Sequence, residues 1–373
     1  MVKVRENHAS TADGGVDIGS WVDYIDAQHP LEDPEVLIQA CRRSLAIDRK
    51  AVREDRLWAP GASSFLTGLE MAQILTELRL DQETLVAAVL YRAVREERMT
   101  LEAVRSEFGE VIAQLIDGVL QMAAISTLHR PLKGNVLGQA QGQHDNIRRM
   151  LVTMVDDVRV ALIKLAERTC AIRAVKDAPP EKRLRVAREV FDIYAPLAHR
   201  LGIGHIKWEL EDLSFRYLHE SAYKKIAKLL DEKRVDRDAH VRRVAQTLKE
   251  SLGEAGIEAE VAGRAKHIYS IWRKMRRKGI DFSEVYDIRA LRVLVPQVRD
   301  CYAAIGVVHG IWRHIPHEFD DYIANPKENG YQSLHTAVVG PEGKTMEVQI
   351  RTHDMHEDAE LGVCAHWRYK GTD

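Results

Sequence analysis

Cysteine is scarce in this sequence, and its few cysteines do not cluster. The four residues, Cys41, Cys170, Cys301 and Cys364, lie far apart and form no Cys-x-x-Cys pair. Scattered cysteines of this kind are typical of free thiols in a reducing compartment. The sequence therefore argues against a disulfide-stabilised secreted protein and against a zinc site built on cysteines.

Long apolar runs and a strong net charge are also absent. The first residues contain no apolar segment of the kind found in signal peptides, and no later run is long and uncharged enough to span a bilayer. The formal net charge of the 373-residue chain is only −2, so attraction for a phosphate-rich ligand has to come from a local patch. We expect a soluble, cytoplasmic protein of two or three domains with no membrane partner.

The first two-thirds of the chain have the sequence pattern of helices. After a polar lead-in over residues 1–30, apolar residues recur at three- and four-residue spacing, most clearly in residues 69–75 and 85–90. Asp81 is placed to cap the second of these helices. Residues 131–143 are rich in glycine and glutamine, and we expect a loop there.

The pattern changes after Gly256, where alternating and β-branched segments begin. We expect strands at residues 257–261, 288–295, 334–339 and 345–350, and helices at 266–279, 299–315 and 354–369. Strands that alternate with helices indicate a mixed sheet with helices packed on it.

Basic residues are concentrated around the first strand and helix of this second region. Arg264 is followed by Lys266, Ser270, Lys274 and Arg277, which recur at helical-turn spacing and give the helix one cationic face. Such a face suits a triphosphate, although a solvated basic surface has the same pattern.

The other candidate residues lie on predicted strands and on one loop. Arg264 and Arg292 are expected on neighbouring strands, where their planar guanidinium groups could enclose a purine ring. Asp287 begins a strand and Glu347 belongs to another, and a sparse pair of carboxylates suits Mg²⁺ together with phosphate oxygens. A salt bridge for the first acid and a solvent-facing position for the second are the ordinary alternatives. Tyr331 is presented on a loop, where an aromatic ring can stack on a base.

These motifs, in this order, resemble those of the RelA/SpoT family, whose synthetase domain makes (p)ppGpp. The resemblance implies transfer of the β,γ-pyrophosphate of ATP to the 3′-hydroxyl of GDP or GTP, with Mg²⁺ as cofactor. It implies that Asp287 and Glu347 bind the metal and are catalytic, with Glu347 sharing the ion or accepting the hydroxyl proton. The residues it assigns to ATP are Arg264, Lys266, Ser270, Lys274, Arg277 and Arg292. Those it assigns to the acceptor nucleotide are Lys327, Asn329, Tyr331, His335, Gln349 and Arg351.

One segment departs from the pattern of the bifunctional members of this family. Those members carry a basic Arg-x-Lys-Asp segment where this chain has Glu318-Phe319-Asp320-Asp321. The acidic version resembles the RelA-type branch, which only synthesises. Replacing two cations by two acids near a nucleotide site is expected to alter metal demand and acceptor preference.

The helical first half resembles the HD hydrolase domain of the bifunctional members, which binds Mn²⁺. The residues that align with the hydrolase site are Thr67, Tyr91, Arg92, Arg95, Glu96, Glu167 and Ala171. Tyrosine, arginine and alanine cannot rebuild the shell of a divalent metal, so the resemblance implies a degenerate hydrolase. The dyad His144-Asp145 lies outside the matching helix, and we interpret it as a loop histidine before a helix-capping aspartate.

The expected fold is therefore multi-domain, α followed by α+β. We predict a degenerate HD-type domain over residues 1–180, a helical connector over 181–250, a nucleotidyltransferase-like synthetase domain with a mixed sheet flanked by helices over 251–353, and a C-terminal helix over 354–373. Family members of the RelA type continue into modules that contact the ribosome and uncharged tRNA, and we expect those partners to act through a region absent from this sequence.

Two other functions stay open at this point. The chain could be a non-catalytic sensor of a guanine nucleotide or (p)ppGpp, although a retired synthetase would be expected to lose one of its acids, Asp287 or Glu347. It could also be a bifunctional hydrolase, which the residues at Thr67, Tyr91 and Arg92 oppose.

Overall fold

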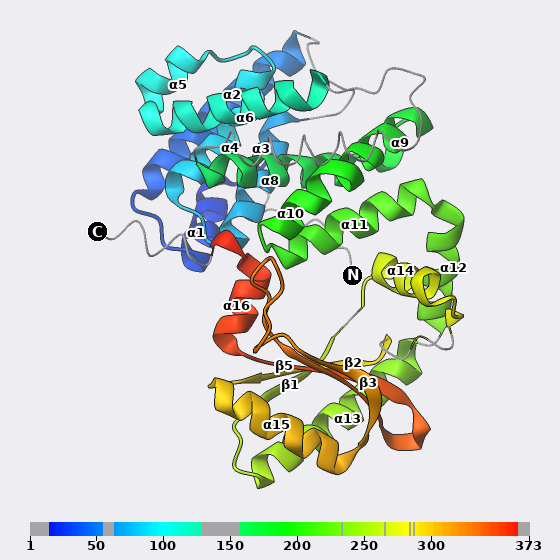
Figure 1. Ribbon diagram of the computed structural model, residues 1–373. Helices are drawn as coiled ribbons and strands as arrows, with labels where there is room; N and C mark the ends of the chain where they lie inside the picture. Colours follow the sequence, from blue (N-terminus) through cyan, green and yellow to red (C-terminus); the bar gives the residue numbers. More distant parts are fainter. Residues whose placement is uncertain are drawn as a thin grey trace. The chain divides into compact units, whose positions relative to one another are not determined.

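The computed structural model describes residues 15–54, 63–128, 157–232, 234–264, 266–282, 285 and 288–364. The chain divides into two compact units (Figure 1). One comprises Lys3–Val186 and Asp192–Tyr194, and the other consists mainly of Ala195–Asp373 with Ala187–Phe191. Predictions that fall on the loop at 131–143, on His144-Asp145 and on Asp287 lie outside the described residues.

The first unit is helical throughout its described part. Its helices are α1 (Ile18–Gln28), α2 (Pro34–Arg53), α3 (Ser64–Glu77), α4 (Gln82–Arg95), α5 (Leu101–Phe108), α6 (Glu110–Leu128) and α8 (Val158–Ala174). The predicted cap at Asp81 is confirmed, because its carboxylate accepts the backbone N–H of Thr84 at 2.9 Å. Nearly every residue of α4 from Thr84 to Val94 is buried, so this helix forms the centre of the unit.

The polar lead-in predicted over residues 1–30 is wrong in its second half, where α1 forms. The helix is capped by Asp17, whose side chain accepts the backbone N–H of Ser20. Its apolar face is small, with Trp21, Val22 and Ile25 buried. Ile18, Trp21, Val22 and Ile25 recur at three- and four-residue spacing, so the sequence does contain the period of this helix.

Further helices follow in the chain before the sheet begins, and the boundary between the two units falls within residues 187–194. They are α9 (Pro180–Glu189), a π-helical turn (Val190–Tyr194), α10 (Ala195–Arg200), α11 (Gly204–Leu218), α12 (Glu220–Glu232) and α13 (Arg234–Glu254). Pro180 occupies the first position of α9, where its missing N–H is not needed.

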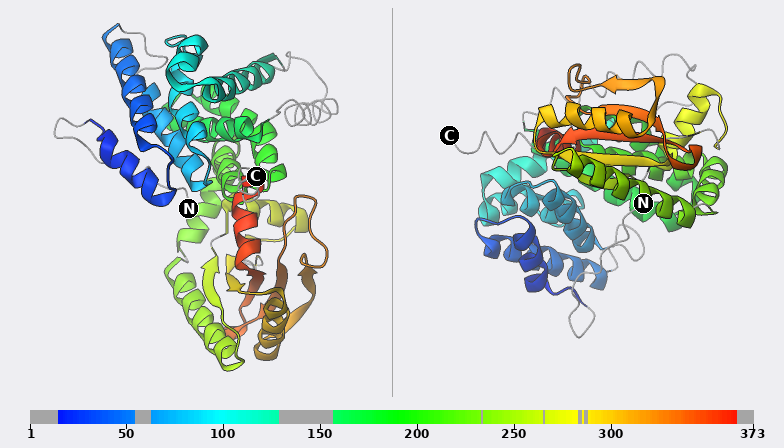
Figure 2. Two further views of the ribbon diagram at one scale, coloured as in Figure 1. Left: turned by 90° about the vertical axis from the view of Figure 1, so that its left-hand side faces the viewer. Right: turned by 90° about the horizontal axis from the view of Figure 1, so that it is seen from below.

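The second unit is built on one five-stranded mixed sheet (Figure 2). Its strands are β1 (Glu260–Arg264), β2 (Ala290–Val295), β3 (Arg313–Asp321), β4 (Leu334–Val339) and β5 (Thr345–Thr352), in the order β1-β2-β5-β4-β3. The β2–β5 pair is parallel and the other pairs are antiparallel. The remaining helices are α14 (Ile268–Lys278), α15 (Val298–Ile311) and α16 (His353–Leu361).

Strand alternation gives this sheet one apolar face and one polar face. On the apolar face, residues such as Val293, Val348 and Ile350 are fully buried together with side chains of α13 and α15. Figure 1 shows both helices on that side of the sheet. The register pairs Arg292 with Gln349 across β2 and β5, so the alternate residues of these strands form the opposite, polar face.

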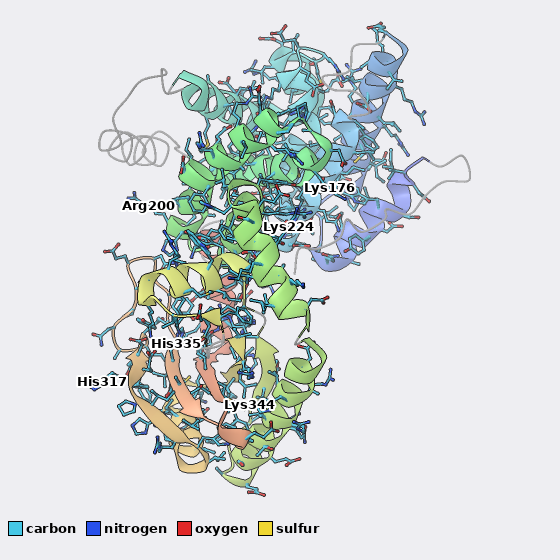
Figure 3. The ribbon with its side chains drawn as sticks, turned by 90° about the vertical axis from the view of Figure 1, so that its right-hand side faces the viewer. Lys176, Arg200, Lys224, His317, His335 and Lys344 are labelled. Carbon is cyan, nitrogen blue, oxygen red and sulfur yellow. The ribbon has the colours of Figure 1, made fainter. Side chains whose placement is uncertain are left out.

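The predicted strands at 334–339 and 345–350 are confirmed as β4 and β5, and the bounds of other predicted elements differ. The first strand begins at Glu260 and not at 257. The predicted helix at 299–315 ends at Ile311, and β3 follows directly. No strand was predicted there, because β3 is a mostly exposed edge strand that contains Pro316 and a bulge between His314 and Phe319. In Figure 3, His317 of this bulge points outward from the edge, whereas His335 lies toward the interior of the unit.

Candidate active site

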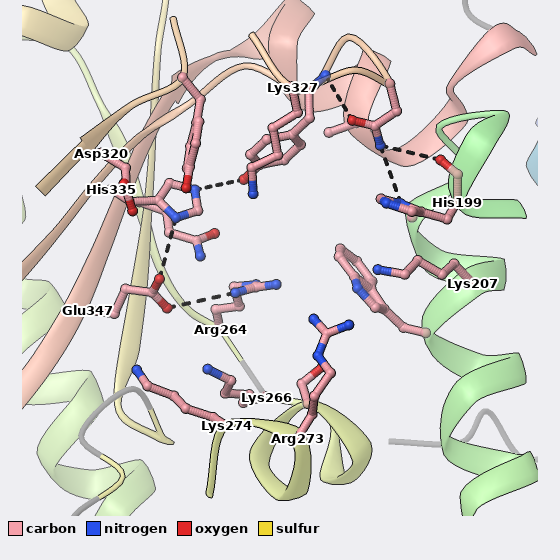
Figure 4. Close-up of a pocket in the computed structure, with 18 of the residues that line it drawn as sticks. His199, Lys207, Arg264, Lys266, Arg273, Lys274, Asp320, Lys327, His335 and Glu347 are labelled. Atoms are coloured by element: carbon pink, nitrogen blue, oxygen red, sulfur yellow. Dashed lines mark hydrogen bonds and ion pairs between the residues drawn. The ribbon is translucent and has the colours of Figure 1, made fainter. Parts of the chain in front are cut away.

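A cavity of about 380 Å³ lies over the polar face of the sheet, within the second unit. It is bordered by β5, by α14, by the start of α11 and by the loop between β3 and β4 (Figure 4). Eight lysine and arginine residues line it, against four carboxylates; the cations are Lys207, Arg264, Lys266, Arg273, Lys274, Arg277, Lys278 and Lys327. The cavity therefore suits a ligand with several negative charges.

Helix α14 supplies much of this positive charge, and it is fixed at both its start and its apolar face. Asp212 of α11 accepts the backbone N–H groups of Tyr269 at 2.8 Å and Ile268 at 3.3 Å, so a neighbouring helix provides the N-terminal cap. Ile271 packs into a small core on the opposite side. Ser270, Lys274 and Arg277 consequently face the cavity, as the row predicted from the sequence requires. Lys266 also lines the cavity, but it precedes the helix. The prediction that it belongs to the helical row is therefore wrong.

Burial and neighbouring cations lower the pKa values of several lysines in the cavity. Burial, together with the charges of Lys274, Arg264 and Arg273, lowers the pKa of Lys266 to about 8 despite the nearby Glu347. Burial and neighbouring cations also lower the pKa values of Lys274 and Lys327. A bound polyphosphate would supply the missing negative charge and relieve this repulsion.

Glu347 of β5 is the acid at the centre of the polar face. Its Oε1 lies 3.5 Å from Nδ1 of His335, and its Oε2 lies 3.9 Å from Nη1 of Arg264 (Figure 4). Burial by itself raises the pKa of this carboxyl, but the hydrogen bond from His335 and the charges of Lys266 and Arg264 hold it well below its usual range. Oε2 is buried and accepts no hydrogen bond, so one oxygen keeps its lone pairs for another ligand.

Such a carboxylate fits a magnesium ion, because Mg²⁺ is commonly held by one or two carboxylates and phosphate oxygens. The second predicted ligand, Asp287, lies outside the described residues. Within the described ranges, no group of three or more histidine, cysteine, aspartate or glutamate side chains is placed to hold a metal ion.

The loop between β3 and β4 brings the predicted acceptor residues together. The Tyr331 hydroxyl lies 2.9 Å from Nε2 of His335, and the ammonium of Lys327 lies 5.2 Å from the centre of the Tyr331 ring. Asn329 donates to the backbone oxygen of His199 at 3.3 Å, which ties the loop to the end of α10. These acceptor candidates all line the cavity.

Two predicted residues, Arg292 and Arg351, are not among the cavity-lining residues. They lie on the same polar face but point toward α16, where both are within 4.0 Å of Glu360. The other predicted residues of the described part, Gln349 included, line the cavity.

The cavity also contains residues that the sequence did not reveal. Lys207 and Trp208 reach it from α11, and the guanidinium of Arg264 lies 5.4 Å from the Trp208 ring centre. No local pattern marks α11 as part of a site, because its contribution depends on tertiary packing. Arg273 was recognisable, since it lies three residues after Ser270 on the same helical face.

The acidic segment on β3 contributes two cavity residues, Glu318 and Asp320. Glu318 accepts a hydrogen bond from Lys278 of α14 at 2.6 Å. The acidic segment at residues 318–321, which differs from the basic segment of the bifunctional members, therefore contributes to the cavity wall.

The first unit holds a buried charge cluster at the predicted hydrolase positions. Glu167 lies 2.7 Å from Arg95, 2.9 Å from Lys164 and within hydrogen-bond reach of Arg168. Burial alone raises the pKa of Glu167, but Arg168 and Lys164 hold it well below its usual range. Burial lowers the pKa of Lys164 to about 8 although Glu167 is adjacent.

The other hydrolase positions have ordinary structural partners. Arg92 pairs with Glu96 at 2.7 Å, and Tyr91 is fully buried. The Thr67 hydroxyl donates to the backbone oxygen of Ser63, as helical threonines often do. Ala171 follows the buried stretch of α8.

Comparisons with known proteins match the two halves of the chain to different families. Residues 44–204 match the HD domain family, and residues 263–373 match the family described as a region found in RelA/SpoT proteins. A GTP pyrophosphokinase of Photobacterium angustum is 54% identical over 304 residues, which cover 81% of this chain and 40% of that protein. A GTP pyrophosphokinase of Escherichia coli K12 is 53% identical over 312 residues, which cover 83% of this chain and 42% of that protein.

One solved structure that the chain resembles is small alarmone synthetase 1 of Bacillus subtilis bound to its product pppGpp. The two are 28% identical, the match covers 40% of this chain and 84% of that chain, and the TM-score is 0.30. The sequence relatives are therefore the basis of the assignment. The fold and the matches define a class of proteins in which a helical HD domain precedes a RelA/SpoT region. The chain belongs to the RelA/SpoT family, and it spans about two-fifths of the length of the curated relatives named above. No helix in the described ranges is long and apolar enough to cross a membrane.

Proposed function

We propose that this chain is a (p)ppGpp synthetase, which transfers the β,γ-pyrophosphate of ATP to the 3′-hydroxyl of GDP or GTP. The observation that carries the proposal is the cavity on the polar face, where a wall of cations surrounds one half-buried carboxylate, Glu347, whose pKa is held well below its usual range. The relatives named GTP pyrophosphokinase, at 54% and 53% identity, support the same reaction.

The donor nucleotide is assigned to the side of the cavity formed by β1 and α14. Lys266, Ser270, Lys274 and Arg277 hold the triphosphate, since they line that wall and lie close in space. Arg264, which lines the cavity, is assigned to one face of the adenine, and Arg292, on the neighbouring strand beside the cavity, is assigned to the other. Positioning two nucleotides in one water-poor site supplies much of the rate enhancement in transfers of this kind.

The acceptor nucleotide is assigned to the loop between β3 and β4. Tyr331 stacks on the guanine, and Lys327 and His335 contact the phosphates and ribose. Asn329 orders the loop through its bond to His199, while Gln349 and Arg351 support the acceptor side from β5.

Magnesium is the cofactor we propose, held by Glu347 together with Asp287. These two carboxylates would hold the ion, which would supply positive charge to offset that of the phosphate oxygens. Because the pKa of Glu347 lies well below its usual range, this carboxylate stays ionised and is a poor proton acceptor at neutral pH. We therefore assign Glu347 to the metal rather than to removal of the hydroxyl proton.

The first unit is proposed to be an inactive hydrolase domain. Arg95, Lys164 and Arg168 surround Glu167 where a metal-binding hydrolase needs free histidine and aspartate ligands. Residues 1–180 would form this domain, 181–250 the connector, 251–353 the synthetase and 354–373 the C-terminal helix. We also propose that the protein acts in the cytoplasm and that the ribosome and uncharged tRNA act on it through a region beyond this sequence.

A single assay tests the proposed reaction. The chain is incubated with ATP labelled in its γ-phosphate, GDP or GTP, and Mg²⁺, and the products are separated by chromatography. Label in (p)ppGpp is the expected result. Binding of both nucleotides without product would identify a non-catalytic sensor, and Mn²⁺-dependent loss of added ppGpp would identify a hydrolase; either one would contradict the proposal in part or in full.

A further inference from the structure

The polar face of the sheet carries two arginines that share one carboxylate. Arg292 of β2 and Arg351 of β5 lie on neighbouring parallel strands. Nη2 of Arg292 is 3.8 Å from Oε1 of Glu360 on α16, and Nη2 of Arg351 is 3.5 Å from the same oxygen. Among the described residues, no other carboxylate lies within ion-pair distance of either arginine.

Two adjacent guanidinium groups in a mostly buried setting repel each other. The Arg351 side chain is only 3% exposed and that of Arg292 is 24% exposed. Burial lowers the pKa values of both arginines, with the charge of Arg264 adding to the shift at Arg292 and that of Arg292 adding to it at Arg351, and Glu360 opposes the shift in both. Nε of each arginine is buried without a hydrogen-bond partner, so the guanidinium planes are held by the contacts to α16 and, for Arg351, also by the Tyr331 ring, whose centre lies 5.9 Å from Cζ of this arginine.

His356, one turn before Glu360 on α16, cannot replace this carboxylate. Its Nδ1 accepts a hydrogen bond from Nη2 of Arg351 at 2.6 Å, which requires a neutral ring with its proton on Nε2. Burial and the two arginines lower the pKa of His356 to about 4, in agreement with a neutral ring. Nε2–H then faces Nη1 of Arg292 at 3.5 Å, so two donors meet and no bond forms. Glu360 is left to compensate Arg292.

We propose that Glu360 is a positioning residue that holds Arg292 for the donor nucleotide and Arg351 for the acceptor nucleotide at the same time. This inference depends on the proposed function, because it is that function which assigns one arginine to each nucleotide. A single carboxylate between the two would align both binding subsites, so its removal should affect both substrates. Glu360 itself touches neither nucleotide.

The test measures steady-state kinetics of wild-type protein, Glu360→Gln and Glu360→Asp, with ATP and GDP each varied in turn. Because a partly exposed ion pair is lost at each arginine, Glu360→Gln should raise the KM for ATP and for GDP by about three- to fivefold each. The kcat at saturation should change by less than about twofold, since both arginines can still be ordered by bound nucleotide. Glu360→Asp keeps the charge and should give intermediate KM values.

Asp354→Asn on the same helix is the matched control, because Asp354 is exposed and its loss removes an equal charge. It should leave both KM values unchanged. A rise in only one KM, or a lower kcat with both KM values unchanged, would overturn the inference. If Glu360→Gln does not fold by circular dichroism, Glu360→Asp decides the matter by the same criterion.

Failure of this inference is distinct from failure of the proposed function. If the wild-type chain transfers no pyrophosphate, the proposed function is wrong. Calorimetric titration with a non-hydrolysable ATP analogue and with GDP then tests Glu360 directly. Weaker binding of both nucleotides by Glu360→Gln supports the shared positioning, and unchanged binding of either refutes it.

Discussion

Binding of ATP should weaken as the pH rises from neutral to mildly alkaline values, because Lys266 loses its proton in that range. The pKa of Lys266 is about 8, and only the protonated lysine attracts the triphosphate. With that pKa, about nine-tenths of the protein carries the charge at pH 7 and about one-tenth at pH 9. If only the charged form binds, the apparent Kd for ATP rises about tenfold over this interval.

The assay is equilibrium titration with a non-hydrolysable ATP analogue and Mg²⁺ at several pH values. Lys266→Arg is the matched control, since arginine stays protonated throughout and keeps one positive charge at the site. The Kd of this variant for the ATP analogue should change little from pH 7 to pH 9. Any change that remains measures titration of the nucleotide itself and can be subtracted. A wild-type Kd that follows the variant over the whole range would refute the assignment of Lys266 to the phosphates.

Three other substitutions test separate parts of the molecule. Tyr331→Ala should raise the KM for GDP by about five- to 150-fold, since stacking on a base is worth about 1–3 kcal/mol, and should leave the Kd for ATP unchanged. A KM for GDP equal to that of the wild type would show that the ring does not bind the acceptor. Glu347→Gln should lower kcat by about a hundredfold or more, because a metal ligand contributes several kcal/mol to transition-state stabilisation, and it should change Tm little. A variant that retains a tenth of the wild-type activity would contradict the metal assignment. Glu167→Ala should lower the free energy of unfolding by about 3–5 kcal/mol in urea titrations, because it leaves Lys164 and Arg168 buried without their shared carboxylate. A loss below about 1 kcal/mol would show that the cluster relaxes into water.

The parts of the fold that could be predicted from sequence are those with a strong local period. The helix α4 and the hairpin of β4 and β5 were predicted close to their true bounds, because apolar spacing and the Gly340–Gly343 turn mark them. The edge strand β3 was missed, since its sequence has no regular apolar alternation and includes Pro316. Helix α1 could have been predicted, because Ile18, Trp21, Val22 and Ile25 recur at helical spacing.

The candidate site was predictable where its residues form a local motif. The α14 row and the Tyr331 loop could be recognised in this way, and the structure places both at one cavity. Lys207 and Trp208 could not be recognised, because α11 meets the cavity only through packing of distant segments. The sequence also could not show that Arg292 and Arg351 face a helix rather than the open cavity. That arrangement depends on Glu360, which follows the strands in the chain and has no motif of its own.

The two-faced alternation of β5 restricts the changes of length that this strand can undergo. Its odd-numbered residues Glu347, Gln349 and Arg351 lie on the polar face, while Val348 and Ile350 are fully buried on the other. Deleting or inserting one residue within the strand would exchange these two sets. Charged side chains would then face the apolar layer, and Glu347 would no longer face the cavity. The neighbouring turn has no such restriction, so length variation in this part of the molecule is expected between the strands and not within them.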